Sequence, residues 1–178
     1  MAALIPSASA TGSGTMTLAG PSTNSNQTVT IPDATGTMMV SGNMPAFRAY
    51  RNGSQTISAA TTTKVAFNAE TFDTNNNYDP TTNYRFTPTV AGYYQVNSTV
   101  GFTTSSGQLS IYKNGSNYQT GIEVTYNASL GGHIPISDIV YCNGSTDYIE
   151  IYVYLLLGTT ISSGETNTSF SASMVRGA

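Results

Sequence analysis

Charged residues are scarce in this sequence. Only 8% of its 178 residues are Asp, Glu, Lys or Arg, against about a quarter in an average protein. Six basic residues against nine acidic ones give a formal net charge of -3, which disfavours nucleic acid and anionic membranes as partners. Hydrophobic residues still reach 39%, so the chain can bury a core and does not have the composition of a disordered protein.

Cysteine, histidine and long apolar runs are also nearly absent. Cys142 is the single cysteine, so an intrachain disulfide is excluded and a small buried apolar residue is expected. His133 is the single histidine, which excludes a histidine cluster for a transition metal. The longest apolar run, Ile151 to Leu157, is far shorter than the ~20 residues of a membrane span, so no membrane insertion is expected. The first ten residues lack the basic region of a signal peptide.

Side chains that could support catalysis do not form a recognisable arrangement. His133, Ser137 and Asp138 are close in the sequence, but a catalytic triad is defined by geometry, and we interpret their proximity as chance. The carboxylates are scattered, and no glycine-rich phosphate loop precedes a helical pattern. The sequence therefore predicts a protein that is not an enzyme.

One stretch superficially resembles a calcium loop. Asp73, Asn75, Asn77 and Asp79 alternate like the oxygen ligands of such a loop, but its glycine and its terminal Glu are missing. We interpret the stretch as an Asn/Asp-rich turn and expect no metal or other cofactor, with calcium as the weaker alternative.

The rest of the chain is organised around residues 84–102, YRFTPTVAGYYQVNSTVGF. Pro88 and Gly92 supply a turn. Beyond them, apolar and polar residues alternate with a period of two, which predicts a central β-strand with one buried face. The buried set is Tyr94, Val96, Ser98, Val100 and Phe102.

Further short strands are predicted at roughly regular spacing, separated by turn signals such as Asn-Gly pairs. No segment has helical periodicity, so the sequence predicts an all-β sandwich or barrel. The predicted strands and the main polar loop are 45–51, 62–68, 108–113, a strand from Tyr118, 137–141, 147–157, 169–175 and the loop 73–83.

The strand at Tyr148–Leu157 is apolar on both faces. Ile149, Ile151, Val153, Leu155 and Leu157 suit a sandwich core. The opposite face carries three tyrosines, and a strand that is apolar on both faces is usually buried on both. We therefore predict a subunit interface; an ordinary exposed tyrosine ladder is the alternative. The predicted interface residues are Tyr148, Tyr152, Tyr154 and Leu156, together with Tyr93.

Residues 1–43 differ from the remainder, because they are poor in aromatic residues and rich in Ser, Thr, Gly and Pro. Their short alternating pieces are too small to hold a core alone. We predict an extended attachment and trimerisation segment that packs against a neighbouring copy or another protein, followed by a globular head at 44–178. A flexible linker is the alternative. The alternating apolar residues are Met16 and Leu18, Val29 and Ile31, and Met38 and Val40.

Two stretches of this segment resemble known proteins. Residues 14–21, GTMTLAGP, and residues 29–37, VTIPDATGT, are similar to a "TLPDATGT" pattern of bacteriophage tail-fibre and virion-surface proteins, where it precedes a C-terminal head. The resemblance implies a location at the virion surface and attachment to other virion proteins. It assigns that attachment to Leu18, Val29, Ile31 and Met38.

The order of signals after residue 45 resembles the globular head of complement component one, subcomponent q, and its relatives in the tumour-necrosis-factor superfamily. The signals are Pro45-Ala-Phe47, Val65-Ala-Phe-Asn68, Phe86-Thr-Pro88, Gly92-Tyr-Tyr94, residues 109–115 and Phe170-Ser-Ala-Ser-Met174. The resemblance implies a jelly roll of about ten strands that forms a homotrimer. The sequence departs from the family in lacking a collagen-like stalk and in having NGSTD at 143–147, where the family has an acidic pair, which puts a family calcium site in doubt.

Polar, uncharged loops suit recognition of a neutral glycan or a protein on the host surface. The predicted contact residues are Asn75, Asn77, Tyr78, Tyr118 and Tyr126. The sequence thus favours a non-enzymatic, homotrimeric fibre or spike of a phage virion, anchored by its N-terminus and touching the host with its head. The alternative is a capsid-decoration (head-fibre) protein that docks on and stabilises the shell. A secreted complement-like ligand is less favoured.

Overall fold

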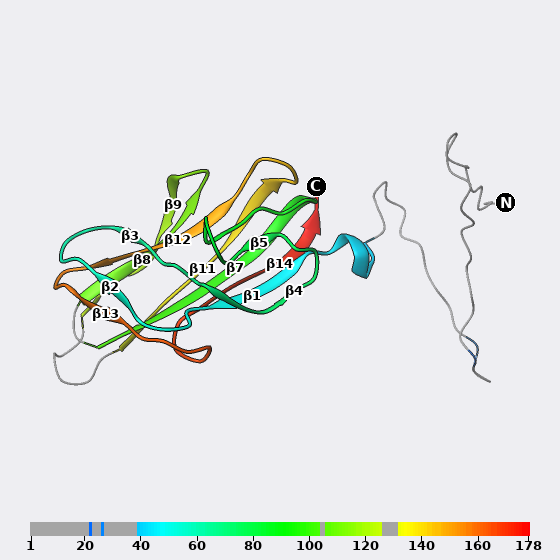
Figure 1. Cartoon of the computed structure of the whole chain (residues 1–178). Coiled ribbons are helices and arrows are strands. Elements are labelled where there is room, and N and C mark those ends of the chain that lie inside the picture. Colours follow the sequence, from blue (N-terminus) through cyan, green and yellow to red (C-terminus); the bar gives the residue numbers. More distant parts are fainter. Residues whose placement is uncertain (1–21, 23–25, 27–38, 104–105, 126–131) are drawn as a thin grey trace. The chain divides into compact units, whose positions relative to one another are not determined.

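The computed structural model describes residues 22, 26, 39–103, 106–125 and 132–178. The chain divides into two units, residues 1–36 and 37–178, and the second unit is the head (Figure 1). The predicted attachment residues Leu18, Val29, Ile31 and Met38 lie outside the described residues, as does Tyr126.

The head consists of β-strands preceded by one 3-10 turn, η1, at Ser41–Asn43. No helix within the described ranges is long and apolar enough to cross a membrane. The strands are β1 (Ala46–Tyr50), β2 (Gln55–Ile57), β3 (Thr63–Lys64), β4 (Ala69–Asp73), β5 (Tyr78–Asp79), β6 (Arg85–Phe86), β7 (Ala91–Phe102), β8 (Ser106–Lys113), β9 (Ser116–Thr120), β10 (Val124–Thr125), β11 (Gly132–Asn143), β12 (Ile149–Leu155), β13 (Thr159–Ile161) and β14 (Ser169–Gly177).

These strands form two antiparallel sheets. The first has the order β2-β13-β7-β14-β1-β4, with β11 also paired to β7. The second has the order β10-β8-β12-β6-β5, with β3 paired to β12 and β9 paired to β8. The predicted all-β jelly-roll sandwich is therefore confirmed.

Strand β7 is central, as the alternation predicted. It pairs with β11 from Ala91 to Phe102 on one side and with β14 on the other. Tyr94, Val96, Ser98, Val100 and Phe102 are all buried, and Tyr93 and Asn97 are exposed.

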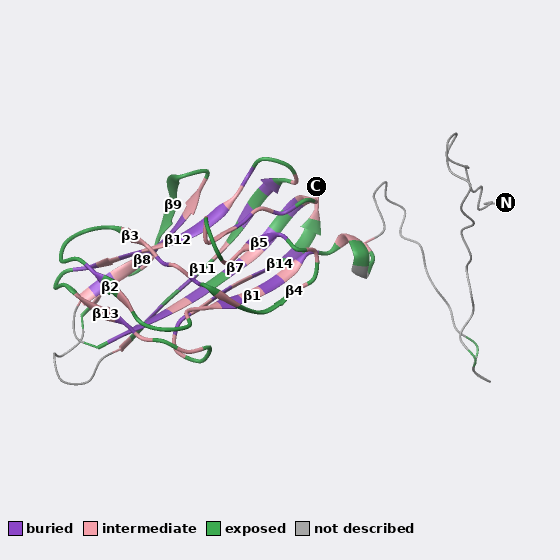
Figure 2. Cartoon of the chain, in the orientation of Figure 1, coloured by how far each residue is buried: buried purple, intermediate pink, exposed green. Residues whose placement is uncertain are grey.

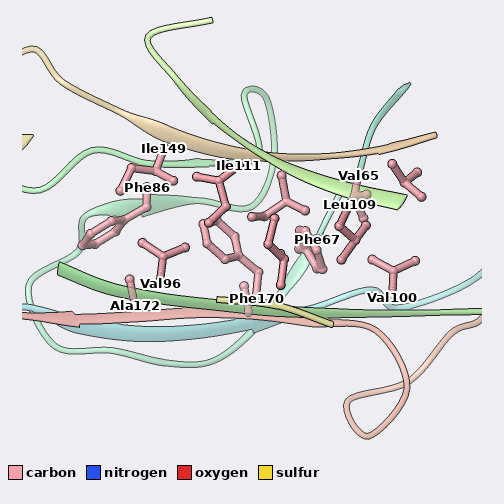
Figure 3. Packing of buried hydrophobic residues seen from close by; sticks show 14 of the residues in the cluster. Val65, Phe67, Phe86, Val96, Val100, Leu109, Ile111, Ile149, Phe170 and Ala172 are labelled. Atoms are coloured by element: carbon pink, nitrogen blue, oxygen red, sulfur yellow. The ribbon is translucent and has the colours of Figure 1, made fainter. Parts of the chain in front are cut away.

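The core lies between the two sheets and is rich in aromatic rings. Figure 3 shows Ile111, Phe86 and Ile149 facing Val96 and Ala172 across this space. Phe47 stacks on Phe86 and Tyr78 at ring-centroid distances of 4.5 and 4.8 Å, and it meets Phe170 edge-on at 4.9 Å. Aromatic pairs of this kind add to the stabilisation from burial alone.

Several predicted elements differ from the observed ones. Strand β11 is much longer than the predicted 137–141. Strand β4 was not predicted, and only its last residue, Asp73, falls within the predicted loop 73–83. Only Thr63–Lys64 of the predicted strand 62–68 is extended in a ladder, although Val65 and Phe67 are buried. Leu157 is 61% exposed, so its assignment to the core was wrong; β12 ends at Leu155, before it.

The head has two distinguishable ends. At the junction pole, defined by Gly42, Asn75, Asn143 and Ala178, the chain begins the head and also finishes. There Asn75 Nδ2 donates to Gly42 O, and Ala178 N donates to Ala91 O. Ala91 is also the ladder partner of Asn143.

The opposite end is the distal pole, defined by residues 58–62, Thr103, Ser106 and residues 156–160. Its loops are tied together by hydrogen bonds from Ala60 N to Leu155 O, from Leu156 N to Ser106 O, and between the hydroxyls of Thr103 and Thr159. In Figure 1 the C-terminus marks the junction pole, and β2 and β13 end toward the other pole.

Candidate interaction surfaces

The outer face of β12 is covered by side chains of its own sheet. We name the outward residues Tyr148, Glu150, Tyr152 and Tyr154 the β12 face. The Tyr152 ring stacks on Tyr112 from β8 at 4.0 Å, and Arg85 from β6 lies 4.2 Å from the centre of the Tyr148 ring. Tyr148 and Tyr152 are consequently only partly exposed, and Tyr154 is partly exposed as well.

An ion pair lies in the middle of the β12 face. Lys64 Nζ is 2.5 Å from Glu150 Oε1 and also donates to Asn83 O. The Glu150 side chain is only 4% exposed, whereas that of Lys64 is 32% exposed. Burial raises the pKa of the Tyr152 hydroxyl, and the Glu150 carboxylate raises it further. A buried carboxylate of this kind depends strongly on its partner.

These contacts alter the interpretation of the β12 face. The sequence pattern predicted that this face would be exposed in a single chain. That prediction is wrong for Glu150, which is buried, and Tyr148 and Tyr152 are only partly exposed. Strands β3, β6 and β8 flank β12 on both sides and supply much of the cover within one chain. Leu156 is exposed but belongs to the distal pole, and Tyr93 lies on the other sheet.

The outer face of the first sheet is different, and we call it the open face. Among the described residues at the middle of β7, β11 and β14, the outward positions carry no charge, and their side chains are small or neutral. Exposed and buried positions alternate along these strands in Figure 2. The open face comprises Tyr93, Gln95, Asn97, Thr99, Pro135, Ser137, Ile139, Tyr141, Ser171 and Ser173.

Side-chain hydrogen bonds run across the open face. Gln95 Nε2 donates to Ser137 Oγ at 2.8 Å, and Ser137 Oγ donates to Asn97 Oδ1 at 2.9 Å. A hollow of about 340 Å³ beside this ladder is lined by Asn97, Thr99, Pro135 and Ser137, among others. The face thus offers amide and hydroxyl groups that can form hydrogen bonds with another polar surface in place of water.

Aromatic and aliphatic residues extend the open face toward the junction pole. The Tyr93 and Tyr141 rings lie 5.3 Å apart, and Lys113 Nζ lies 5.5 Å from the Tyr141 ring. Tyr118 of β9 reaches the Ile139 carbonyl at 3.5 Å. Tyr93, Tyr118, Ile139 and Tyr141 are each at least 40% exposed, so together they form an exposed apolar area on the head.

Strand β11 has one edge without a ladder partner among the described strands. Pro135 pairs with Thr99 of β7 and has no N–H to offer a further strand. A proline on an edge strand hinders pairing with the edge of another sheet. A partner for this region would therefore bind through side chains on the open face.

The polar loop 73–83 serves the structure of the junction pole. Thr74 and Ala46 exchange hydrogen bonds, and Asn75 reaches Gly42. Asn77 is buried; its Oδ1 accepts from Thr89 N, and its Nδ2 donates to Asn75 O.

Tyr78 is also buried, and its hydroxyl donates to Phe67 O at 2.9 Å. Burial raises the pKa of that hydroxyl well above its usual range. The prediction that Asn77 and Tyr78 contact a receptor is therefore wrong, because their side chains close turns and fill the core. The Asn/Asp pattern that suggested a solvated loop is used for internal hydrogen bonds.

The two carboxylates of the calcium-like pattern are occupied by backbone donors. Asp73 accepts from the N–H groups of Asn75 and Tyr78. Asp79 accepts from those of Thr82, Thr81 and Asn83. The hydrogen bonds from the Thr82 and Thr81 N–H groups, helped by the Asn83 and Thr81 side chains, hold its pKa well below the usual range. Within the described ranges, no group of three or more His, Cys, Asp or Glu side chains could hold a metal ion.

The residues considered for catalysis have structural partners. The Ser137 hydroxyl bonds to Gln95 and Asn97, and His133 Nε2 lies 3.4 Å from Asn167 Oδ1. Cys142 is fully buried, as predicted, and burial raises the pKa of its thiol to about 12. A thiol with so little thiolate at neutral pH is a poor nucleophile.

Known proteins resemble this chain in fold and not in sequence. No family model and no curated protein sequence matches the chain. Among solved structures, the globular domain of zebrafish complement 1qA has a TM-score of 0.61 at 15% identity, covering 75% of this chain and 99% of that one. Murine APRIL has a TM-score of 0.56 at 12% identity, covering 74% and 99%.

The vertex protein P5 of phage PRD1 has a TM-score of 0.52 at 16% identity, covering 75% of this chain and 97% of that one. At such identities the likeness is one of fold. The head is a jelly roll of the complement and tumour-necrosis-factor type, as the resemblance implied.

Sequence reasoning missed the open face and the Lys64–Glu150 pair. The open face could have been read from the outward set of β7, because Gln95, Asn97 and Thr99 are neutral and lie beside Tyr93. The ion pair had one signal, a single carboxylate at Glu150 among three tyrosines in a chain with few charges.

Proposed function

We propose that the protein is a non-enzymatic homotrimer on the surface of a virion. Residues 1–43 anchor it to other virion proteins, and the head projects toward the host. The observation that carries this proposal is the two-ended head, in which the N-terminal segment joins at one pole and an uncharged set of loops lies at the other. The resemblance of residues 14–37 to virion-surface proteins and the jelly-roll fold support it.

The open face is our candidate for the trimer interface. Its neutral centre and its exposed Tyr93, Tyr141 and Ile139 combine apolar area with side chains that can pair across an interface. The β12 face is a poorer candidate, because much of it is already covered within one chain. Of the interface residues predicted from sequence, this proposal retains Tyr93.

The distal pole is our candidate for host contact, and this proposal moves the contact away from loop 73–83. If residues 1–43 attach to the particle, the junction pole faces the particle. Leu156 and Leu157 at the distal pole are 50% and 61% exposed. Among the described residues 58–62, 103, 106 and 156–160, none is charged. We propose that this end binds a neutral surface, and trimeric display would multiply weak contacts.

Particle incorporation and adsorption test the proposal separately. Deleting residues 1–36 should abolish copurification of the chain with virions, and retained copurification would contradict the anchoring role. In intact particles, Leu156→Ser with Leu157→Ser should reduce adsorption to the host, while Phe72→Ser, a matched exposed apolar site away from the distal pole, should not. Equal effects of the two changes would contradict distal contact. Labelling particles with an antibody to the head would separate a tail location from a capsid location.

A further inference from the structure

The head contains three Asn-Gly pairs, at 52–53, 114–115 and 143–144. All three glycines adopt positive φ, at 84°, 75° and 73°. An asparagine before glycine is chemically labile, because glycine has no Cβ to hinder attack of its backbone nitrogen on the asparagine Cγ. That nitrogen bonds to Cγ, and the side-chain amide leaves as ammonia with the proton of the attacking N–H. Water then opens the cyclic imide to aspartate or isoaspartate.

The reaction requires the asparagine side chain to rotate toward the following nitrogen, so hydrogen bonds that hold the amide oppose it. Asn143 Oδ1 accepts from the N–H groups of Ser145, Thr146 and Asp147, and its Nδ2 donates to Thr146.

Asn114 is held in a similar way. Its Nδ2 donates to Asp147 Oδ1 at 2.7 Å, and its Oδ1 accepts from Tyr148 N at 2.9 Å. Lys113 Nζ lies 2.9 Å from the other oxygen of Asp147. The hydrogen bond from Asn114 lowers the pKa of Asp147, with Lys113 contributing, so this network is charged at neutral pH.

Asn52 differs from both. It is exposed, and its side-chain amide has no hydrogen-bond partner among the residues that the structure describes. The hydrogen bonds of this turn are instead donated by backbone N–H groups. Asn52 N donates to Asn68 Oδ1, and Gly53 N donates to Ser163 Oγ at 3.2 Å. The Asn52 side chain is therefore free to rotate, and the attacking Gly53 N–H has to break only its 3.2 Å hydrogen bond to Ser163 Oγ.

We propose that Asn52 is a site of spontaneous deamidation and isoaspartate formation in the folded protein, and that Asn114 and Asn143 are protected by the fold. Isoaspartate would insert a methylene into the backbone between Arg51 and Gly53. That segment ties β1 to the loop before β14, because Gly164 N donates to Arg51 O and Gly53 N donates to Ser163. The modification would loosen this connection and add a negative charge.

Peptide mapping of the intact chain, aged at mildly alkaline pH, tests the proposal. At each protected site at least two side-chain hydrogen bonds must break, whereas at Asn52 only the bond from Gly53 N must break. Asn52 should therefore convert about tenfold faster or more than Asn114 or Asn143. In the urea-unfolded chain the three rates should converge. Asn52→Gln should remove the fast ammonia release and leave the other two sites unchanged. Conversion at Asn114 or Asn143 that equals or exceeds that at Asn52 in the folded chain would overturn the proposal.

Discussion

The two outer faces of the sandwich differ in how their side chains are covered. The β12 face is apolar in sequence, yet Tyr112, Lys64 and Arg85 from neighbouring strands lie over or beside its tyrosines. The open face is more polar in sequence, yet its tyrosines, with Ile139, remain at least 40% exposed in one chain. An apolar stripe on a strand therefore does not identify an interface until the neighbouring strands are known.

The difference follows from what flanks each strand. Long side chains such as Lys64 extend along apolar surface and bury part of it while their charged ends stay near water. Strands β7 and β14 present Ser, Thr, Asn and Gln outward, and Gln95 and Asn97 form hydrogen bonds with Ser137 of β11. The face with more polar residues is thus the one whose tyrosines are individually more exposed.

The largest change in stability within one chain is expected at the Lys64–Glu150 pair. Lys64→Met would leave the Glu150 carboxylate buried without its cation. Removing one partner of a buried pair costs about 3–5 kcal/mol, and because Lys64 is partly exposed we expect a loss of about 2–3 kcal/mol in the free energy of unfolding, measured in urea.

Two further variants control this prediction. Arg48→Met breaks the more exposed Arg48–Glu165 pair and should cost only about 0.5–1 kcal/mol. Adding Glu150→Gln to Lys64→Met should recover much of the lost stability, because no unpaired charge remains. If Lys64→Met costs no more than Arg48→Met, the internal cover of the β12 face contributes little.

A smaller effect is expected at Tyr152. Tyr152→Ala removes the stack on Tyr112 and the neighbouring Lys64 contact, and should lower the free energy of unfolding by about 1–2 kcal/mol. Tyr118→Ala, at an exposed tyrosine, should change it by less than about 0.5 kcal/mol. Thermal and urea unfolding at low protein concentration would compare the two, and equal losses would contradict the assignment of Tyr152 as covered.

The smallest effect concerns acid stability and loop 73–83. The pKa of Asp79 is lower in the folded chain than in the unfolded chain, so the unfolded state takes up the proton first as the pH falls. Its stabilising contribution is present above about pH 4 and is lost below that. Asp79→Asn should therefore flatten the dependence of stability on pH in this acidic range. An unchanged slope would show that the loop does not depend on this carboxylate.

Local patterns in the sequence predicted the elements that rely on them. Alternation identified β7 and the inward face of β12, and the burial of Cys142 followed from its residue type. Strand β11 was underestimated because Pro135 and Gly131-Gly132 look like breaks, although a proline is acceptable on an edge strand. Strand β4, with the sequence AETFD, has too little apolar character to stand out.

The candidate surfaces were less predictable because they depend on contacts between distant segments. Lys64 reaches Glu150, and Asn75 reaches Gly42, only after the sheets have formed. Asn77 and Tyr78 were also mispredicted for this reason. Their position in an Asn/Asp-rich turn predicted exposure to solvent, yet in the structure both are buried and close the turn against the core.

We propose that the open face, and not the β12 face, joins the chains. Light scattering on two variants tests it most directly: Asn97→Arg places a charge in the middle of the open face, and Tyr154→Arg places one on the β12 face. The wild type and Tyr154→Arg should have the mass of three chains, and Asn97→Arg should have the mass of one. A trimeric Asn97→Arg together with a monomeric Tyr154→Arg would contradict the account and restore the interface that the sequence first suggested.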